Sequence, residues 1–275
     1  LVDNYNGAIS EDDREDILSS AKSVTDNGAV MASLSALQGA SNIVHNRLTL
    51  VRSRLAESSG LSAGSFVEEM NFWVKPYGQL ASLDTDKNMT GYNVDSFGLS
   101  IGVDTQSFIK DTTIGIAISY SESEVSSKDV NQTETDVDTF QIGIYADKHL
   151  ENNASLAGYI GYGHSENGSV RHNVGGVSNL VAEGNYESHQ FILQGQVSKS
   201  FSFKNVNLTP TFFSQYMMYD PDTYKEEGAG TANLSVDYDT YNKLDIGVAI
   251  ELNWTKLTED HAVFSPFVRA SYMYD

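Results

Sequence analysis

Most of the chain alternates between hydrophobic and polar positions, which is the pattern of half-buried β-strands. In segment 244–254 every even-numbered residue is large and apolar, whereas the residues between them include Asp245 and Glu251. Such alternation places apolar side chains on one face of a sheet and small or polar side chains on the other. From residue 71 onward the pattern predicts nine antiparallel strands. Their expected ranges are 71–83, 91–105, 111–125, 134–148, 153–166, 181–201, 205–219, 235–254 and 261–274.

A short phrase recurs four times along this region. It consists of an apolar or aromatic residue, an acid, a Ser or Thr and a ring, as in residues 94–97 (Val-Asp-Ser-Phe), and its copies begin at residues 94, 137, 186 and 238. If every second strand opens with the phrase, all four copies lie at one edge of one antiparallel sheet. A row of rings at the edge of an apolar band is typical of a membrane-spanning barrel at its water interface. The pattern therefore predicts an all-β, antiparallel transmembrane β-barrel.

The alternation also assigns faces to individual side chains. Asp245, Glu251 and Arg269 are predicted to face the lumen, because a wet lumen makes a buried charge far less costly than a dry protein core does. The predicted aromatic rim consists of Trp73, Phe97, Phe140, Tyr241 and Trp254. The predicted lipid-facing residues are Phe97, Leu99, Ile101, Phe140, Ile142, Ile144, Leu244, Ile246, Val248 and Ile250.

Two places in the strands depart from simple alternation. The parity slips by one residue between Tyr241 and Leu244, so we expect a β-bulge there. The strand expected over 205–219 has pairs of adjacent large apolar residues, so its orientation stays open.

The connections between the predicted strands alternate in length. Short turns cover 107–110, 151–153 and 257–260, whereas long polar loops cover 121–134, 165–180 and 220–232. Outer-membrane barrels place short turns in the periplasm and long loops outside the cell. We therefore expect the long loops, and the aromatic phrases that follow them, at the extracellular rim.

The first 60 residues follow a helical pattern instead. Residues 10–13 resemble a capping box that opens a short helix ending near residue 24, and a second helix is predicted over 27–55. At 1.5 Å per residue this second helix is about 43 Å long, close to the thickness of a bilayer with its headgroups. Its polar residues prevent lipid contact, so it can cross a membrane only inside another structure. These residues are Asn42, His45, Asn46, Arg47, Arg52 and Arg54.

Composition narrows the class of protein. The 275 residues include 22 Gly, 15 Tyr and 12 Phe but only 4 Pro and no Cys, and the net charge is −20. The negative charge argues against nucleic-acid binding, which needs cationic side chains, and the absence of Cys excludes disulfides and thiolate metal sites. The sequence contains no apolar run long enough for a transmembrane helix, but barrel strands need only alternation.

Short chemical motifs in the sequence are better explained by strand structure than by catalysis. Residues 98–102 spell the Gly-x-Ser-x-Gly of a nucleophile elbow, yet they lie in mid-strand. Residues 84–88 begin like a calcium loop, but Met89 occupies the required glycine position, so we expect a polar hairpin tip with at most weak cation binding. The six His residues show no metal-ligand spacing. We expect no catalytic, metal or cofactor site.

Acidic side chains crowd the long loop predicted near residues 121–134. They are expected to be a solvated surface, and the alternative is that divalent cations bridge them to lipopolysaccharide. The residues concerned are Glu122, Glu124, Asp129 and Glu134.

Residues 40–275 resemble the translocator domain of bacterial autotransporters, the type V secretion family. The resemblance rests on Asn-Arg-Leu at 46–48, Gly-Leu-Ser-Ala-Gly at 60–64, Trp-Val-Lys-Pro-Tyr-Gly at 73–78, the block at 91–98 and Pro-Phe-Val-Arg at 266–269. It implies a twelve-stranded barrel plugged by an α-helix, which exports an N-terminal passenger to the surface of a Gram-negative cell. The implied organisation is the end of a passenger or a linker at 1–26, a lumen helix at 27–60 and a partial barrel at 70–275.

Further expectations follow from this resemblance. The helix would lie in the lumen, where we infer from charge that Arg47, Arg52 and Arg54 pair with acids such as Asp245 and Glu251. The implied partners are the bilayer, lipopolysaccharide, the passenger, the insertion machinery and periplasmic chaperones, and the domain is expected to be monomeric.

The family barrel has three more strands than the nine found here, so the sequence is expected to be truncated at its C-terminus. No motif matches a known cleavage pair in the helix, and autoproteolytic release of the passenger stays open.

Two other functions are weighed against this one. An outer-membrane porin or adhesin barrel would lack the long polar helix that precedes the first strand. A soluble β-protein, such as a secreted hydrolase, would carry polar residues at 244, 246, 248 and 250.

Overall fold

The computed structural model describes residues 27–56, 70–85, 90–128, 132–174, 180–203, 206–237, 239–254, 256–257, 263–264 and 267–274. The short helix predicted before residue 24 lies outside these ranges. Arg52 and Arg54 belong to the described helix, but their side chains are not among the described ones. None of the described helices is both long and apolar enough to cross a membrane.

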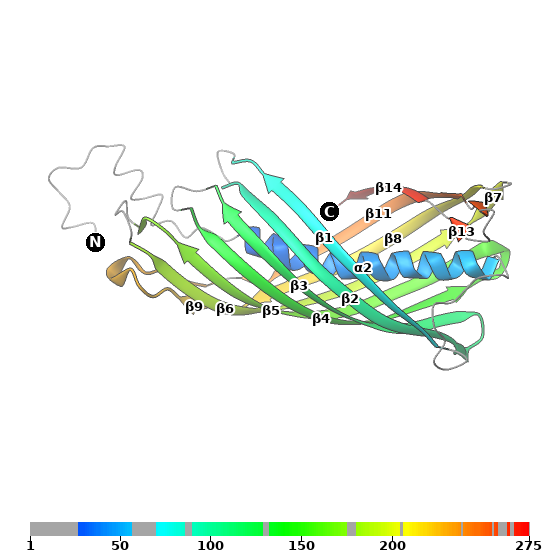
Figure 1. The fold of residues 1–275 in the computed structure, drawn as a ribbon, viewed down its shortest axis with the longest axis horizontal. Helices are drawn as coiled ribbons and strands as arrows, with labels where there is room; N and C mark the ends of the chain where they lie inside the picture. Colours follow the sequence, from blue (N-terminus) through cyan, green and yellow to red (C-terminus); the bar gives the residue numbers. More distant parts are fainter. Residues whose placement is uncertain are drawn as a thin grey trace.

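One long helix, α2 (Asn27–Ala56), lies along the concave side of a curled antiparallel sheet (Figure 1). The strand order is β1-β2-β3-β4-β5-β6-β8-β11-β14, and β7 pairs with β8 beside this path. Among the described strands, β1 and β14 form the two edges of the sheet and do not pair with each other. The main strands are β1 (Met70–Leu83), β2 (Tyr92–Ile109), β3 (Thr112–Ser127), β4 (Glu134–His149), β5 (Ala154–Arg171), β6 (Ala182–Lys199), β8 (Val206–Pro221), β11 (Tyr241–Trp254) and β14 (Phe267–Tyr274).

Smaller elements occupy the connections between these strands. The β8–β11 connection folds into a hairpin of β9 (Tyr224–Lys225) and β10 (Ser235–Val236) with a single 3-10 turn, η4 (Gly230–Ala232). The remaining short elements are η2 (Glu151–Asn153), β7 (Phe201–Phe203), β12 (Lys256–Leu257) and β13 (Val263–Phe264).

The helix and seven of the nine predicted strands agree with the structure in their existence and order, with ends that differ by a few residues. The strand expected over 235–254 begins only at Tyr241, because residues 235–236 pair with β9 instead. The strand expected over 261–274 is divided into β13 and β14. The strand left without orientation is now oriented: Phe213 and Met217 point inward, whereas Phe212 points outward.

The predicted bulge after Tyr241 is wrong. The ladder between β11 and β8 runs without a break from Tyr241–Tyr219 to Trp254–Val206. The alternation is in fact regular. Tyr241 lies on the inner face of β11 together with Asp245, so no extra residue is needed to bring Leu244 to the outer face. The register does shift in the β2–β3 ladder, between Thr105 and Ile109.

Large rings on the inner face lie over glycines of the neighbouring strand. Trp73 is directly opposite Gly102, and Tyr145 is directly opposite Gly115. A Cβ atom at either glycine would overlap the facing ring. Because each glycine has no side chain, the facing ring can lie flat against the sheet. The helix can therefore pack closely on the inner face.

Candidate functional site

The concave side of the sheet and α2 together form a packed interior. The helix contacts β2, β3, β4, β5, β6 and β8. Leu37, Val44 and Leu48 on the helix pack against Tyr159 and Ile192 on the wall, and these side chains are buried. Burying one large aliphatic side chain contributes about 1.5–3 kcal/mol. The helix is therefore held by an apolar core, where the sequence led us to expect a wet lumen around a polar helix.

A buried polar network fastens the middle of the helix to β2. The Arg47 guanidinium donates to Asp104 through Nε at 2.7 Å and Nη2 at 2.9 Å, a bidentate ion pair. Tyr145 Oη donates to the same carboxylate at 3.1 Å, and Trp73 Nε1 donates to Tyr145 Oη at 2.9 Å. Four side chains from α2, β1, β2 and β4 are thus joined in one network.

This network corrects two predictions. Trp73 is only 8 % exposed, inside the sheet, so it does not belong to the aromatic rim. Its ring turns inward because Gly102 opposite leaves room for it and Tyr145 accepts its N–H. The partner of Arg47 is Asp104, rather than Asp245 or Glu251, because Asp104 lies on the wall that the helix faces at that level.

The predicted lumen acids have other neighbours on the inner face. Lys243 Nζ lies 3.1 Å from Asp245, and Gln215 donates to the same carboxylate at 3.1 Å. Glu251 lies directly opposite Arg269 in the β11–β14 ladder, and the Arg269 guanidinium contacts His45 of the helix. The structure thus brings His45 together with Arg269, and it keeps Asp245 apart from the helix arginine.

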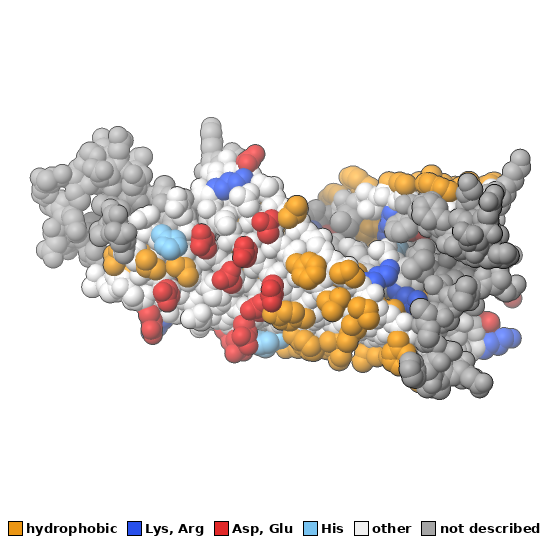
Figure 2. Space-filling model, viewed as in Figure 1, with side chains coloured by type: hydrophobic (Ala, Val, Ile, Leu, Met, Phe, Trp, Pro, Cys, Tyr) orange, Lys and Arg blue, Asp and Glu red, His pale blue; other side chains and the backbone are white. Residues whose placement is uncertain are grey.

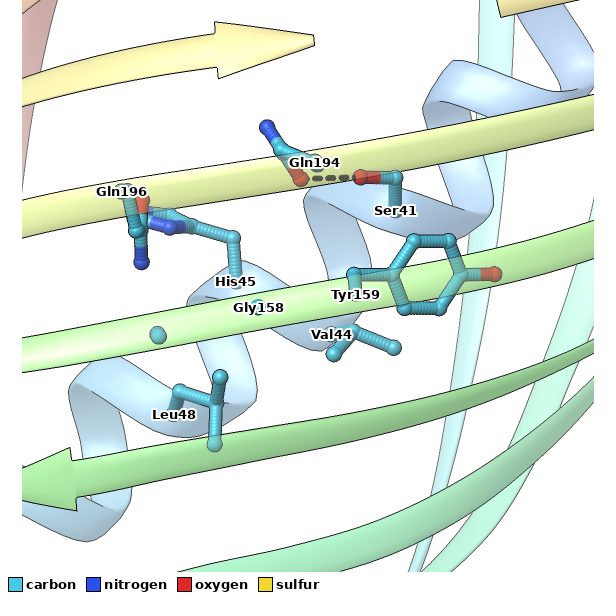
Figure 3. Close-up of a pocket in the computed structure, with 9 residues that line it drawn as sticks. Ser41, Val44, His45, Leu48, Gly158, Tyr159, Gln194 and Gln196 are labelled. Atoms are coloured by element: carbon cyan, nitrogen blue, oxygen red, sulfur yellow. Dashed lines mark hydrogen bonds between the residues drawn. The ribbon is translucent and has the colours of Figure 1, made fainter. Parts of the chain in front are cut away.

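The middle of the helix also approaches β5 and β6 closely (Figure 3). Ser41 Oγ donates to Gln194 Oε1 at 2.5 Å, Val44 lies beside Tyr159, and Leu48 lines the same pocket farther along the helix. On the opposite side of the helix Asn42 is exposed and Asn46 is half-buried. They continue a stripe with Met31, Ser35 and Gln38 that does not lie under the described sheet.

The direction of the helix follows from its contacts at each end. Ala29 and Ala32 pack against Val94, Val125 and Val137, which lie near the long loops. Farther along, His45 and Thr49 line one cavity with residues of the short β4–β5 turn (His149, Leu150 and Asn153). The helix therefore runs from the long-loop rim to the short-turn rim, and its first residue, Asn27, lies at the long-loop rim.

The outer face carries a continuous apolar band, and all ten residues that were predicted to face lipid are exposed on it. Phe97, for example, is 66 % exposed and Ile144 is 56 % exposed. Large exposed apolar areas are unfavourable in water and mark contact with an apolar partner or solvent. Contact with lipid itself stays a prediction. Trp254 ends the band at the short-turn side, whereas Tyr241 lies on the inner face and is not part of an outward rim.

Acidic side chains border the band on its long-loop side (Figure 2). Glu122, Asp138, Glu166 and Glu187 are directly opposite one another across β3, β4, β5 and β6. The outer surface thus changes from apolar to anionic at this row of residues across β3–β6. Such a change is expected where strands leave the apolar part of a membrane.

Polar contacts that the sequence pattern does not reveal join described residues of the long connections to one another and to the strands. Arg171 Nε donates to Glu226 at 3.0 Å, and the Tyr186 and Tyr224 rings stack at 4.8 Å, so the β9–β10 hairpin is fixed to β5 and β6. Lys128 Nζ lies 2.9 Å from Asp84 Oδ1, linking the loops after β1 and β3. This hydrogen bond and the positive charge of Lys128 hold the pKa of Asp84 below its usual value.

Known proteins resemble this chain in sequence and fold. A family model described as the autotransporter beta-domain matches residues 72–275. Outer membrane protein B of Rickettsia typhi is 22 % identical over 290 residues, which cover 97 % of this chain but 17 % of that protein. Outer membrane protein A of Rickettsia conorii is 26 % identical over 237 residues, covering 78 % of this chain and 11 % of the relative. The chain thus spans less than a fifth of the length of these relatives.

Two solved structures share the fold. The translocator domain of the autotransporter NalP from Neisseria meningitidis superposes with a TM-score of 0.61 at 15 % identity, covering 86 % of this chain and 79 % of that one. The beta domain of the Bordetella autotransporter BrkA gives a TM-score of 0.57 at 12 % identity, covering 75 % and 80 %.

A curled antiparallel sheet with an apolar outer face and a helix along its inner face defines a translocator β-domain of the bacterial outer membrane. The chain belongs to the autotransporter beta-domain family.

Proposed function

We propose that this chain is the membrane-embedded part of a longer polypeptide, which it anchors in the outer membrane and whose N-terminal passenger it exports to the cell surface. The direction of α2 is the observation that carries this proposal. The helix occupies the interior of the sheet, and its N-terminus lies at the long-loop rim. Because long loops of such barrels lie outside the cell, a passenger upstream of Asn27 is outside as well.

The proposal includes closure of the barrel by further strands between β14 and β1. An unpaired strand edge in hydrocarbon leaves backbone N–H and C=O groups without partners, at several kcal/mol each. The two unpaired edges of the described sheet therefore need partners in the membrane. The exposed polar stripe with Asn42 and Asn46 is then covered by the inner face of those strands.

The proposed role is transport, and the domain contributes no catalytic step to it. The partners included in the proposal are the bilayer with its lipopolysaccharide, the passenger, the insertion machinery and periplasmic chaperones. One copy is sufficient, because the helix and the wall come from the same chain. A diffusion porin fits less well, since α2 and the apolar core around Leu37 occupy the middle of the described interior.

Epitope labelling on intact bacteria tests the proposal. One epitope is placed directly upstream of Asn27, a second in the long loop after Asn173, and a third in the short turn between Glu151 and Asn152. We expect antibodies to reach the first two on intact cells and the third only after the outer membrane is permeabilised. Labelling of the short turn on intact cells, or protection of the upstream epitope, would contradict the proposed orientation and export.

A further inference from the structure

Two histidines and a glutamate meet on the outer face, where β5 and β6 leave the apolar band. His164 and His189 are directly opposite each other in the β5–β6 ladder, and their ring centroids are 5.1 Å apart. Glu187 shares the outer face with them, and one of its carboxylate oxygens lies 3.9 Å from His164 Nε2. One ligand atom from each of the three lies within 4.8 Å of the others.

We propose that His164, Glu187 and His189 form a binding site for a divalent transition-metal cation, and that Zn²⁺ is the ion their ligand set suits best. Two imidazole nitrogens and one carboxylate oxygen are a common zinc ligand set, and the fourth tetrahedral position stays open to water here. Ligands at about 2.0–2.2 Å from one ion lie roughly 3.4 Å apart in a tetrahedral site. Small rotations of the three half-exposed or exposed side chains bring them to this separation.

The surroundings of the cluster support a cation. Tyr162 Oη lies 2.7 Å from His189 Nδ1. When Nδ1–H donates to this oxygen, the lone pair of Nε2 is free for a metal, which is the usual orienting contact of a metal-bound imidazole. Glu166 is directly opposite Glu187, and Asp220 is directly opposite His189, so two further carboxylates add negative charge.

The position of the cluster gives the metal a structural role. Ile160 and Leu193 belong to the apolar band just beside it on the same two strands, whereas Glu166 lies on the polar side. A bound ion would join β5 to β6 at the level where the strands pass from hydrocarbon to water. The two histidines are 25 positions apart in the sequence, so only the strand register reveals the cluster.

Cobalt binding by the full-length protein in detergent tests the site, after a chelator has removed bound metal. We expect one tetrahedral Co²⁺ with its visible absorption, which Zn²⁺ displaces. His164→Ala and His189→Ala should each weaken Co²⁺ binding by about tenfold or more, while His172→Ala, one residue beyond the end of β5 and outside the cluster, should leave it unchanged. Glu187→Gln should weaken it in the same direction.

Thermal unfolding gives a second readout that does not depend on other metal sites in the full-length protein. Because a ligand stabilises the folded state that binds it, Zn²⁺ should raise the unfolding midpoint of the wild type and of His172→Ala, but not of the variants that lack a ligand. Folding of each variant is checked by its heat-modifiable migration on gels. Equal Co²⁺ affinity and an equal Zn²⁺-induced shift in the wild type and in a folded His164→Ala, His189→Ala double variant would overturn the proposal.

Discussion

Arg47 carries a positive charge into the interior of the sheet, and Asp104 alone among its described contacts neutralises that charge in a bidentate ion pair. Asp104→Ala should cost about 3–5 kcal/mol of unfolding free energy, because it leaves a buried guanidinium without a counter-charge. Urea unfolding of the protein in detergent measures the change.

Two control variants make this test specific. Asp95→Ala, on the exposed outer face of the same strand, should stay within about 0.5 kcal/mol of the wild type. Replacing both partners by apolar residues, Arg47→Met with Asp104→Leu, should recover most of the loss, since no charge is then buried. If the double variant lost as much unfolding free energy as Asp104→Ala, the unpaired charge of Arg47 would not be the cause of the loss.

The contact between Asp84 and Lys128 makes a small pH-dependent contribution at the long-loop rim. Lys128 lowers the pKa of Asp84 from its usual 3.8. A carboxyl group with a lowered folded-state pKa stabilises the fold above its unfolded pKa, and this contribution disappears as pH falls through the folded pKa. The difference in melting temperature between the wild type and Asp84→Asn should therefore be constant above about pH 5 and vanish under strongly acidic conditions. A difference that grows on acidification would contradict this assignment.

At the scale of the elements, ring-over-glycine pairs shape the wall that receives the helix. A Cβ atom at Gly115 would overlap the Tyr145 ring, whereas nothing lies within 4 Å of a Cβ at Gly195 on the outer face. Gly115→Val should destabilise the domain by about 1–3 kcal/mol, as overpacking does. Gly195→Val should have a much smaller effect on the unfolding midpoint, and equal effects at both positions would argue against a packed inner face.

Strand alternation made much of this architecture predictable, because period-two patterning assigns every residue of a regular strand to one face. It correctly separated Leu244 and Ile246 from Asp245. Trp73 was misassigned because an aromatic residue near a strand end suits either a rim or a glycine-lined inner face, and only the register with Gly102 decides between them. Asp104 is an even-numbered position like Ser100 and Gly102, so its inward orientation could be predicted from the sequence. Its pairing with Arg47 could not, because it depends on the position of the helix along the sheet.

For the whole molecule, we expect α2 to lie along the inner face of the sheet when the protein is in a membrane. The Ser41–Gln194 hydrogen bond marks a point of contact. A short bifunctional thiol reagent should join the two cysteines of Ser41→Cys, Gln194→Cys in membranes, because both side chains face each other inside. Ser41→Cys with Leu193→Cys, whose second position points outward, is the matched control. Cross-linking of the control pair alone would exclude this placement.

Spin labels along β11 distinguish an outer face that contacts lipid from an inner face that is packed against the interior. The described chain contains no Cys, so single cysteines at 244–254 can carry spin labels whose exposure to oxygen and to a water-soluble nickel complex is measured in lipid vesicles. We expect high oxygen exposure at even positions such as Val248 and Ile250, and low exposure to both reagents at odd positions such as Ala249. Access of the nickel complex to the even positions, or exposure without a period of two, would contradict this expectation.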